Sequence, residues 1–245
     1  MTVVNWNVQW ATPRSQRSPE ILGRIAEHTP EIICLTETDA GLLAQNGHTI
    51  CSEPDYGSGA MKNRRKVLLW SKQPWDKIDC LRNTSWTVGR FVSGVTDTSL
   101  GQMLVVGICI PWSHSRTRRY GGNSEAWQDH ENYLNGLADL LARTPTHRTI
   151  VVGDFNQPIA QSGNVPARLR AKLRCAIPPR MTIATAGLGS RGKRTIDHIV
   201  LSADLTAESL GIISNIHEDK KLSDHFGVAA TLTTQTAPIS NHSEE

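Results

Sequence analysis

The sequence contains no long hydrophobic run. Its longest apolar stretches, such as Met103–Pro111, hold fewer than half of the ~20 residues that a membrane-spanning helix needs. The opening segment, MTVVNWNVQW, lacks the basic start and the extended apolar stretch of a signal peptide. Internal repeats and glycine/serine or proline linkers are also missing. These absences exclude a membrane span and predict a soluble protein, which we expect in the cytoplasm.

Cysteines are few and are not spaced as metal-binding pairs. The five cysteines lie at positions 34, 51, 80, 109 and 175, an odd number without zinc-type pairs. Cys34 and Cys109 fall inside apolar, strand-like runs. Reduced thiols in a cytoplasmic protein therefore fit the pattern better than a disulfide framework does.

The length and the apolar content suffice for one large domain. The chain has 245 residues, of which 38% are hydrophobic, and apolar blocks recur along all of it, which excludes a disordered protein. A folded chain of this length buries roughly 70–75% of the surface that its unfolded form exposes. We predict a single domain over residues 1–232, followed by a polar, flexible tail at 233–245.

Acidic residues are absent from a long segment in the second half. The 42 residues from Phe155 to Ile196 include no Asp or Glu, although the net charge of the whole chain is only +3. The segment carries eight basic residues: Arg168, Arg170, Lys172, Arg174, Arg180, Arg191, Lys193 and Arg194. Solvated surface faces are one interpretation, but an acid-free stretch of this length favours a polyanionic partner.

Short apolar runs with strand character alternate with helical patterns. The strand-like runs are Thr2–Val8, Ile32–Thr36, Val67–Ser71, Met103–Ile110, Thr149–Gly153, Thr195–Leu201 and Phe226–Leu232. Helical patterns begin at Ser18, near Ser124 and at Pro166. This mixture predicts an α/β or α+β domain.

Acid, amide and imidazole groups stand at the ends of several strand-like runs. They are Asn5, Asn7, Glu37, Asp154, Asn156, Asp197, His198, Asp224 and His225. Strand ends hold such groups rigidly at a cleft, although Asp and Asn are also ordinary turn residues. Oxygen ligands from Asp, Glu and Asn suit Mg²⁺ or Mn²⁺, whereas a tetrahedral zinc site would need Cys and His.

Taken in order, these motifs resemble those of the endonuclease/exonuclease/phosphatase superfamily, also called deoxyribonuclease-I-like. The matching segments are Val4–Val8 (VNWNV), Pro30–Thr38 (PEIICLTET), Lys66–Lys72 (KVLLWSK), Val151–Asn156 (VVGDFN), Thr195–Ser202 (TIDHIVLS) and Ser223–His225 (SDH). They cover nearly the whole chain. The resemblance implies an α/β (α+β) fold, a four-layered αββα sandwich with two mixed β-sheets packed face to face and helices outside.

The resemblance also implies a metal site. In the family pattern, Glu37 holds a divalent ion, Mg²⁺ or Mn²⁺, with help from Asn7 and Asp224. Such an ion polarises a phosphoryl oxygen and counters the charge of the leaving group.

Four further residues match the family's catalytic positions. Asp154 and Asn156 orient the attacking water and the phosphate in that pattern, and the imidazole of His225 lies against the phosphate. Asp197 would orient this imidazole and raise its pKa. His198 follows Asp197 directly, so on a strand it points to the opposite face, and we assign it a structural role.

The chain departs from the family pattern at one position. Many members carry a His or Tyr just past the central strand of the second sheet, where this chain has Cys109. His114 and Tyr120 are candidate general acids in its place. His130 is a third, although it shares a helical stripe with Trp127 and is better explained as a packed core histidine.

The resemblance and the basic segment together predict a metal-dependent phosphodiesterase, a nuclease that acts on DNA or RNA and that we expect to be an endonuclease. The residues expected to contact successive phosphates are Arg168, Lys172, Arg191, Lys193 and Arg194. Trp10 and Trp112 lie next to the motifs as candidate stacking surfaces. No protein partner can be inferred from the sequence.

Two other functions remain open at this point. The same chemistry serves a phosphatase or phosphodiesterase acting on inositol-phosphate or sphingomyelin-type headgroups, because basic loops suit any polyphosphate. A nucleic-acid-binding module with impaired catalysis is the alternative of another class, to which Cys109 lends slight support.

Overall fold

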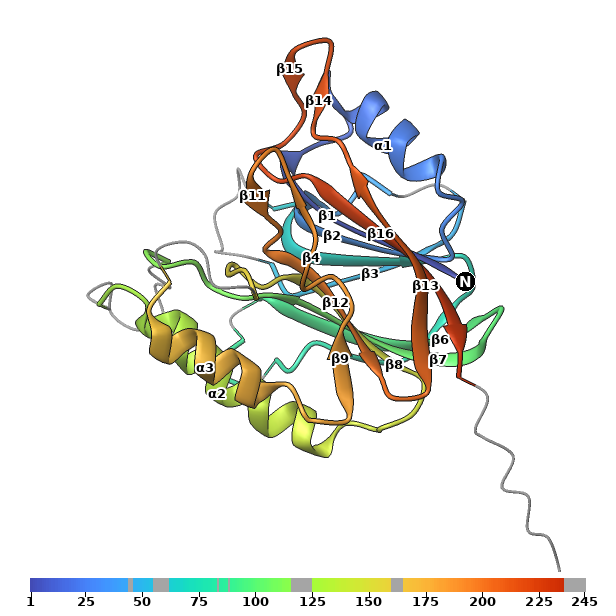
Figure 1. The fold of residues 1–245 in the computed structure, drawn as a ribbon. Helices are drawn as coiled ribbons and strands as arrows, with labels where there is room; N and C mark the ends of the chain where they lie inside the picture. Colours follow the sequence, from blue (N-terminus) through green and yellow to red (C-terminus); the bar gives the residue numbers. More distant parts are fainter. Residues whose placement is uncertain are drawn as a thin grey trace, which may run out of the picture.

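The computed structural model describes residues 1–43, 46–54, 62–82, 84–87, 89–115, 125–159 and 165–235. These residues form two six-stranded sheets that lie face to face, with helices on the two outer sides (Figure 1). Each sheet contains both parallel and antiparallel neighbours. The predicted four-layered αββα sandwich is confirmed.

The first sheet contains the amino-terminal and carboxy-terminal strands side by side. From edge to edge its strands are β13 (Leu205–Ile213), β16 (Gly227–Thr234), β1 (Thr2–Ala11), β2 (Ile32–Asp39), β4 (Arg64–Ser71) and β3 (His48–Cys51). β1 and β2 run parallel, whereas β1 and β16 run antiparallel. The end of β1 therefore lies beside the end of β2 and the start of β16.

The second sheet supplies the middle and later strands of the sequence. From edge to edge these are β5 (Trp75–Asp79), β6 (Phe91–Thr98), β7 (Gly101–Cys109), β8 (Thr149–Asp154), β12 (Asp197–Ser202) and β9 (Met181–Ile183). β7 and β8 are parallel, and β8 and β12 are antiparallel. The ends of β7 and β8 therefore lie beside the start of β12.

Two short hairpins extend from the sheets. One consists of β10 (Gly189–Ser190) and β11 (Lys193–Arg194), and the other of β14 (Ile216–His217) and β15 (Lys220–Lys221). Figure 1 shows the β14–β15 hairpin projecting at the top of the molecule and β11 near the ends of the sheets.

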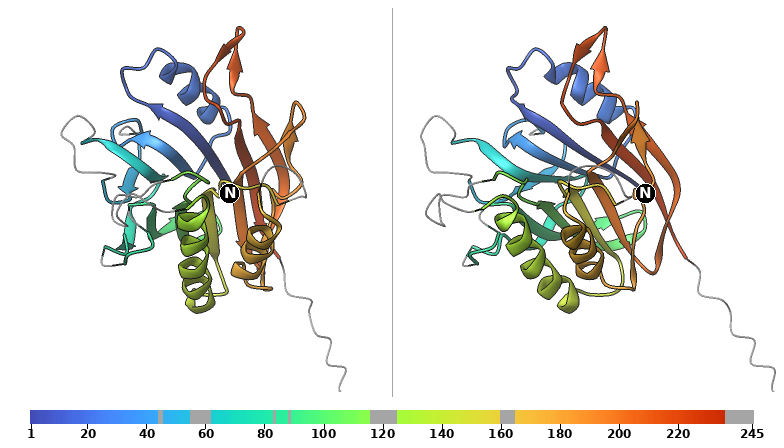
Figure 2. Two further views of the ribbon diagram at one scale, coloured as in Figure 1. Left: turned by 90° about the vertical axis from the view of Figure 1, so that its left-hand side faces the viewer. Right: turned by 60° about the vertical axis from the view of Figure 1, so that its left-hand side comes forward.

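The helices cover the outer faces. They are α1 (Ser18–Ala26), α2 (Gln128–Arg143) and α3 (Ala167–Ala176). α1 lies on the first sheet, while α2 and α3 lie side by side on the second (Figures 1 and 2). Leu134, Leu137 and Leu141 of α2 are buried against the second sheet because their spacing places them on one helical face. Among the described residues, no helix is long and apolar enough to cross a membrane.

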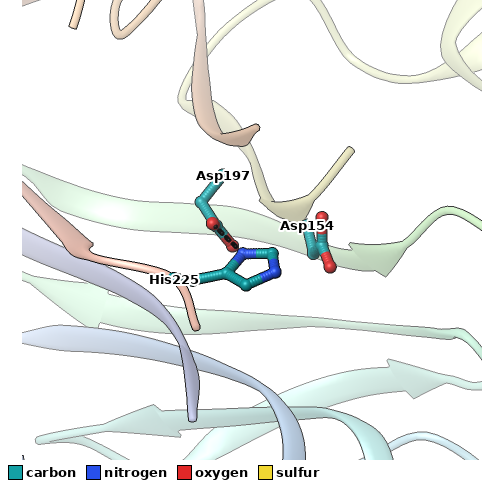
Figure 3. Close-up of side chains that lie close together, drawn as sticks. All are labelled: Asp154, Asp197 and His225. Carbon is teal, nitrogen blue, oxygen red and sulfur yellow. Dashed lines mark hydrogen bonds and ion pairs between the residues drawn. The ribbon is translucent and has the colours of Figure 1, made fainter. Parts of the chain in front are cut away.

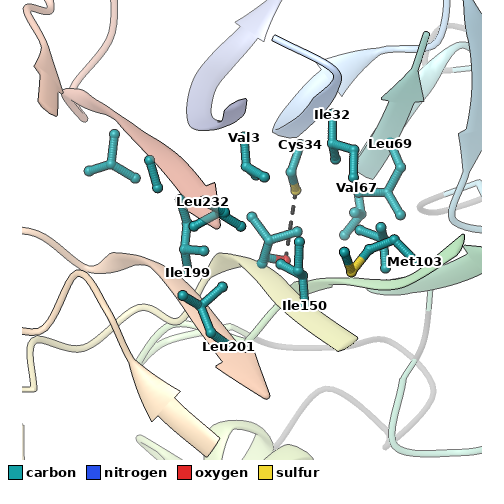
Figure 4. Close-up of a cluster of buried hydrophobic side chains, with 14 of the residues drawn as sticks. Val3, Ile32, Cys34, Val67, Leu69, Met103, Ile150, Ile199, Leu201 and Leu232 are labelled. Carbon is teal, nitrogen blue, oxygen red and sulfur yellow. Dashed lines mark hydrogen bonds between the residues drawn. The ribbon is translucent and has the colours of Figure 1, made fainter. Parts of the chain in front are cut away.

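Successive side chains of the central strands point to opposite faces of the sheet, which explains how both faces become buried. In β2, Ile32 and Cys34 join the core between the sheets, whereas Ile33 and Leu35 join the cluster that includes residues of α1. Figure 4 shows Cys34 pointing from the first sheet toward the second. Successive strand side chains point to opposite faces, so a continuous apolar run fills both layers. Each fully buried Ile or Leu stabilises the fold by roughly 1.5–3 kcal/mol.

The last strand, β16, extends to Thr234. Residues 236–245 lie outside the described residues, so the predicted tail stays a prediction.

Candidate functional site

Three side chains that are distant in the sequence meet where strands of the two sheets end (Figure 3). Asp154 ends β8, Asp197 begins β12, and His225 lies just before β16. The antiparallel register of β8 and β12 places Asp154 opposite Asp197. One ligand-type atom from each of the three residues lies within 4.8 Å of the other two. The fold thus brings together three of the four predicted catalytic residues in one cluster.

Asp154 is held by hydrogen bonds to both of its carboxylate oxygens. Its Oδ1 accepts from the backbone N–H of Asn156 at 2.8 Å, and its Oδ2 accepts from the side-chain amides of Asn156 and Asn7, each at 3.0 Å. The amide of Asn156 also donates to the carbonyl of Ile110 at 2.8 Å. Asn156 has a left-handed backbone (φ 53°), which Asn adopts more readily than most residues. The fourth predicted catalytic residue therefore orients Asp154 directly.

Glycine is required immediately before Asp154. Gly153 has a φ of 146°, and a Cβ at this position would lie 1.8 Å from the carbonyl oxygen of Ile108 on β7. A side chain would push β8 away from β7 and displace Asp154 with it. The glycine of the Gly-Asp-Phe-Asn motif thus sets the position of the carboxylate that follows.

His225 forms an ion pair with Asp197. Its Nδ1 donates to Oδ2 of Asp197 at 2.6 Å, and Asp197 is only 1% exposed. Burial lowers the pKa of His225, but the charge and hydrogen bond of Asp197 raise it, with help from Asp154 and Asp224, and the net result is a pKa of about 10. The imidazole is therefore a cation at neutral pH, and its Nε2–H remains as a second donor.

Burial acts in the opposite direction on the carboxyl groups. Burial and then the charge of Asp197 raise the pKa of Asp154 to about 7, against the opposing effect of His225. Burial also raises the pKa of Asp197, while His225 lowers it. A carboxylate with a pKa near the working pH is suited to accept a proton.

Two asparagines of β1 connect the first sheet to this cluster. Asn5 donates to the carbonyls of Gly153 at 2.9 Å and of His198 at 3.3 Å, both in the second sheet. Asn7, two residues later, donates to Asp154. The period of two directs both side chains toward the opposite sheet. They connect the first sheet to the cluster of Asp154, Asp197 and His225.

The predicted metal residues lie around the cluster rather than within it. Glu37, near the end of β2, accepts from Nζ of Lys66 at 2.9 Å, and its charge raises the pKa of Asp154 and Asp197. Asp224 is exposed beside His225 and raises the pKa of that residue. The roles of Asn7, Glu37 and Asp224 as ligands stay a prediction.

The donor set fits a hard divalent ion. Oδ1 of Asp197 is buried and has no hydrogen-bond partner within the described part of the chain. An unpartnered buried oxygen is costly unless water or a cation satisfies it. A carboxylate oxygen of Asp154 lies within 4.8 Å of one of Asp197, and carboxylate oxygens are ligands that Mg²⁺ and Mn²⁺ prefer.

A pocket of about 450 Å³ opens beside the cluster. Its lining includes Asp197, Asp224 and His225, together with Lys193 and Arg194 of β11. Two of the predicted substrate-binding residues therefore lie next to the predicted catalytic residues. A third, Arg191, lies in the turn of the same β10–β11 hairpin.

The other two predicted substrate-binding residues have partners elsewhere. Arg168 and Lys172 of α3 form ion pairs with Glu131 of α2 at 3.5 and 2.8 Å, and neither lines the pocket. Lys172 also donates to Asn135 at 3.0 Å. These contacts join the two outer helices, and the structure does not bring the pair to the cluster.

Cys109 stands where the family pattern carries a His or Tyr. Cys109 is buried, and burial raises the pKa of its thiol far above the usual range, so it stays protonated. His114 is exposed, with its ring 5.3 Å from that of Trp112 and its Nδ1 2.9 Å from Oγ of Ser113. Tyr120 lies outside the described residues. The assignment of the general acid stays a prediction.

Two further histidines have the structural surroundings that we expected. His198 is buried, with Nε2 donating to the carbonyl of Gln157 at 3.2 Å and Nδ1 3.1 Å from the hydroxyl of Thr185. His130 is buried and donates from Nδ1 to the carbonyl of Pro111 at 2.7 Å. Burial lowers the pKa of each to about 4, so both imidazoles are neutral at pH 7.

Sequence reasoning missed the partner of Glu37. Lys66 belongs to a basic cluster in the sequence (Lys62, Arg64, Arg65 and Lys66), and a position in such a cluster does not indicate that its side chain faces the site. The contact results from the pairing of β2 with β4, and the register of that pairing could not be predicted from the sequence.

Comparisons with known proteins agree with this geometry. A family model described as "Endonuclease/Exonuclease/phosphatase family" matches residues 4–225. A search of curated proteins found no match.

Several solved structures share the fold. An AP endonuclease from Archaeoglobus fulgidus has a TM-score of 0.68 at 15% identity, with 94% of this chain and 98% of that chain covered. The 3′ phosphatase NExo from Neisseria, bound to a product DNA hairpin, has a TM-score of 0.66 at 17% identity, covering 95% and 99%. TDP2 from D. rerio, complexed with a single-strand DNA product, has a TM-score of 0.63 at 15% identity, covering 96% and 99%. At these identities the likeness concerns the fold.

Proposed function

Because the chain belongs to the endonuclease/exonuclease/phosphatase family, we propose that it is a divalent-metal-dependent phosphodiesterase that hydrolyses DNA or RNA. Enzymes of this family are hydrolases of phosphoester bonds that depend on a divalent metal, so a metal-dependent phosphoesterase follows from membership alone. The nucleic-acid substrate and the roles of individual residues are our inference.

The observation that carries the proposal is the cluster of Asp154, Asp197 and His225 beside a pocket lined by Lys193 and Arg194. A phosphodiester anion repels nucleophiles and has a poor leaving group, so its hydrolysis needs a base, a cationic contact and neutralising charge. The cluster contains a carboxylate with a pKa near neutrality and a charged imidazole. The basic hairpin adds the cationic surface at its border.

Asp154 is the residue that we assign to the attacking water. Its carboxylate accepts a proton from the water as the oxygen attacks phosphorus, and the bond from phosphorus to the leaving oxygen breaks. Asn156 and Asn7 keep the carboxylate in the required orientation through their hydrogen bonds.

His225 would contact the phosphate through Nε2–H. Asp197 holds the opposite ring nitrogen, which fixes the ring and keeps it charged. A charged donor of this kind stabilises the negative charge that develops on the phosphoryl oxygens.

Glu37, Asn7 and Asp224 are the residues that would hold the divalent ion. When bound, the ion supplies Lewis-acid polarisation of a phosphoryl oxygen and stabilises the leaving oxygen. Oδ1 of Asn7 accepts from the backbone of Gln9 at 2.9 Å, and a carbonyl oxygen has a second lone pair to offer.

Two features support a polynucleotide over a small phosphoester. Lys193, Arg194 and Arg191 lie on one hairpin at the border of the cluster, where successive phosphates of a strand would pass. Trp112 is 51% exposed and lies two residues after Ile110, whose carbonyl holds Asn156. An exposed indole at this position would stack on a base of the bound strand.

The test is metal-dependent cleavage with matched aspartate variants. The wild-type protein in Mg²⁺ or Mn²⁺ is incubated with circular DNA, linear DNA, RNA and a panel of inositol-phosphate and sphingomyelin-type headgroups. We expect the wild type to cleave nucleic acid. We expect Asp154→Asn to lower turnover by about 10²–10⁴-fold while oligonucleotide binding persists. Cleavage of circles would identify an endonuclease.

The control is Asp97→Asn, because Asp97 is exposed and pairs with Gln102 at the opposite end of the second sheet. This variant should keep wild-type turnover. Turnover of headgroups without cleavage of nucleic acid would overturn the substrate assignment. Oligonucleotide binding without any metal-dependent turnover would favour the impaired binding module instead.

A further inference from the structure

The carboxylate of Glu37, which is expected to bind metal, forms an ion pair with a buried lysine, Lys66. Nζ of Lys66 lies 2.9 Å from Oε1 of Glu37, and the two side chains are 9% and 25% exposed. The pair lies among the acidic residues of the site, since the charge of Glu37 acts on both Asp154 and Asp197. Glu37 thus has a cationic partner supplied by the protein itself.

The fold fixes this lysine in place. The antiparallel register of β2 and β4 pairs Thr36 with Val67 and Thr38 with Arg65, which sets Glu37 beside Lys66. The ammonium also lies 4.6 Å from the ring centroid of Trp10, at the end of β1. A cation over an indole ring is attracted by the negative face of its π-system. Lys66 is therefore held from two sides by strands that form the site.

A divalent ion and an ammonium make competing demands on one carboxylate. Both need the oxygen lone pairs of Glu37, and two cations in a partly buried site repel each other more strongly than in water. The ammonium of Lys66 would have to move away from Oε1 of Glu37 as the ion binds, and separating this ion pair costs free energy. The lysine therefore weakens the binding of metal.

We propose that Lys66 is the resident counter-cation of Glu37 and sets the affinity of the site for its divalent ion by competing for that carboxylate. This inference rests on the proposed function only in taking Glu37 as a metal ligand. In the metal-free protein, Lys66 balances and orients the Glu37 side chain. When metal arrives, the displacement of the lysine opposes binding, so Lys66 acts as a positioning residue whose removal tightens the site.

The test measures Mn²⁺ binding to the purified full-length protein by isothermal titration calorimetry, without nucleic acid. Lys66→Met keeps the length of the side chain and removes its charge, and we expect it to bind Mn²⁺ about three- to tenfold more tightly than the wild type. Lys66→Arg keeps the charge and should stay near the wild-type affinity. A merely structural lysine would give unchanged or weaker binding in Lys66→Met, and that result would overturn the inference.

A matched control separates local competition from net charge. Lys72 is exposed and directly follows β4, about 20 Å from Lys66 along the strand. Lys72→Met removes the same charge and should leave Mn²⁺ affinity unchanged. If it tightened binding as much as Lys66→Met does, the competition at Glu37 would be refuted.

A measurement on the wild-type protein covers the case in which Lys66→Met does not fold. Acetylation of lysines by a water-soluble active ester is followed by mass spectrometry with and without Mn²⁺. Displacement from Glu37 predicts faster modification of Lys66 in Mn²⁺, with Lys72 as the internal reference. An unchanged or slower rate at Lys66 would contradict displacement.

The variant Glu37→Gln distinguishes the two levels of inference. If it leaves Mn²⁺ affinity unchanged, the ligand role of Glu37 in the proposed function fails. If it weakens Mn²⁺ binding while Lys66→Met leaves it unchanged, only the inference about Lys66 fails.

Discussion

At the scale of single residues, the site depends on environments that move pKa values in opposite directions. Burial disfavours charge on Asp154 and His225 alike, yet the aspartates around His225 reverse the effect for the imidazole. The outcome is a carboxyl group that titrates near neutrality within reach of an imidazole that stays charged. This is the combination that water activation and phosphate binding require of neighbouring groups.

The Asp197–His225 ion pair gives the first prediction. In Asp197→Asn the carboxylate that raises the pKa of His225 against the effect of burial is removed, so that pKa should fall from about 10 toward or below its ordinary value. If charged His225 is the active form, the alkaline limb of kcat/KM moves to lower pH. We expect activity at pH 8 to fall by about 10²-fold or more, measured by a pH–rate profile.

A titration of the His225 ring by NMR in the metal-free protein provides an independent measurement. Asp97→Asn serves again as the control and should leave both the profile and the titration unchanged. A ring of His225 that still titrates near pH 10 in Asp197→Asn would show that other groups hold its charge.

At the scale of secondary-structure elements, the basic residues of the acid-free segment divide into two groups. Lys193 and Arg194 of β11 line the pocket beside the cluster. Arg168 and Lys172 of α3 are paired with Glu131 of α2 and contribute to the contact between the helices. The same local excess of charge therefore serves different purposes in a hairpin and in a helix.

This division predicts different salt dependences of binding. In an Asp154→Asn background, which prevents cleavage, Lys193→Gln/Arg194→Gln should reduce the slope of log K against log salt by about 0.7 for each phosphate of a single strand that the hairpin no longer neutralises. Arg168→Gln/Lys172→Gln removes the same charge and should change the slope less, because both residues already have acidic partners. Fluorescence anisotropy of a labelled single-stranded oligonucleotide at several salt concentrations measures both. Equal changes in the two double variants would refute the division.

The strand ends were predictable from the sequence because strand periodicity and the flanking polar residues are local signals. Asp154 and Asn156, two residues apart after an apolar run, are an example, and the resemblance to a family supplied the face-to-face packing of two mixed sheets. The side-chain contacts between neighbouring strands and between neighbouring helices were not predictable. The pairing of Lys66 with Glu37 depends on the register of β4 against β2, and the pairing of Lys172 with Glu131 depends on how two helices pack. Neither ion pair can be predicted from the spacing of its residues in the sequence.

At the scale of the whole molecule, the site connects the two sheets and so makes stability depend on pH. Asn5 and Asn7 reach from the first sheet to the second, and His198 lies buried next to Asp197 in the second sheet. Several buried groups titrate between about pH 4 and pH 7, and they do not all act in the same sense. Their contributions must be separated by variants.

His198 should reduce stability in acid. Its pKa is about 4 in the folded protein, lowered by burial, against about 6.5 when unfolded. As pH falls, the unfolded chain therefore binds the proton first. The contribution of His198 to the free energy of unfolding is complete above about pH 6.5 and is lost between about pH 6.5 and pH 4. From pH 7 to pH 5 the decrease is about 2 kcal/mol in the free energy of unfolding.

Asp154 acts in the opposite sense over the same range. Its pKa is raised to about 7 in the folded protein, so the folded form takes up a proton first and is stabilised as pH falls. The wild-type curve alone combines the two effects. The difference between the wild type and His198→Gln isolates the histidine, since Gln keeps a polar side chain and does not titrate.

Urea unfolding at pH 7 and pH 5 measures this difference. We expect His198→Gln to be less stable than the wild type at pH 7, because it lacks the imidazole's hydrogen bonds to Gln157 and Thr185. At pH 5 the gap between the two proteins should narrow by about 2 kcal/mol, because only the wild type must keep a histidine neutral. If the difference in unfolding free energy between the two proteins is the same at pH 5 and pH 7, His198 must have the same pKa in the folded and unfolded chains. That result would contradict the buried position of the imidazole between Gln157 and Thr185.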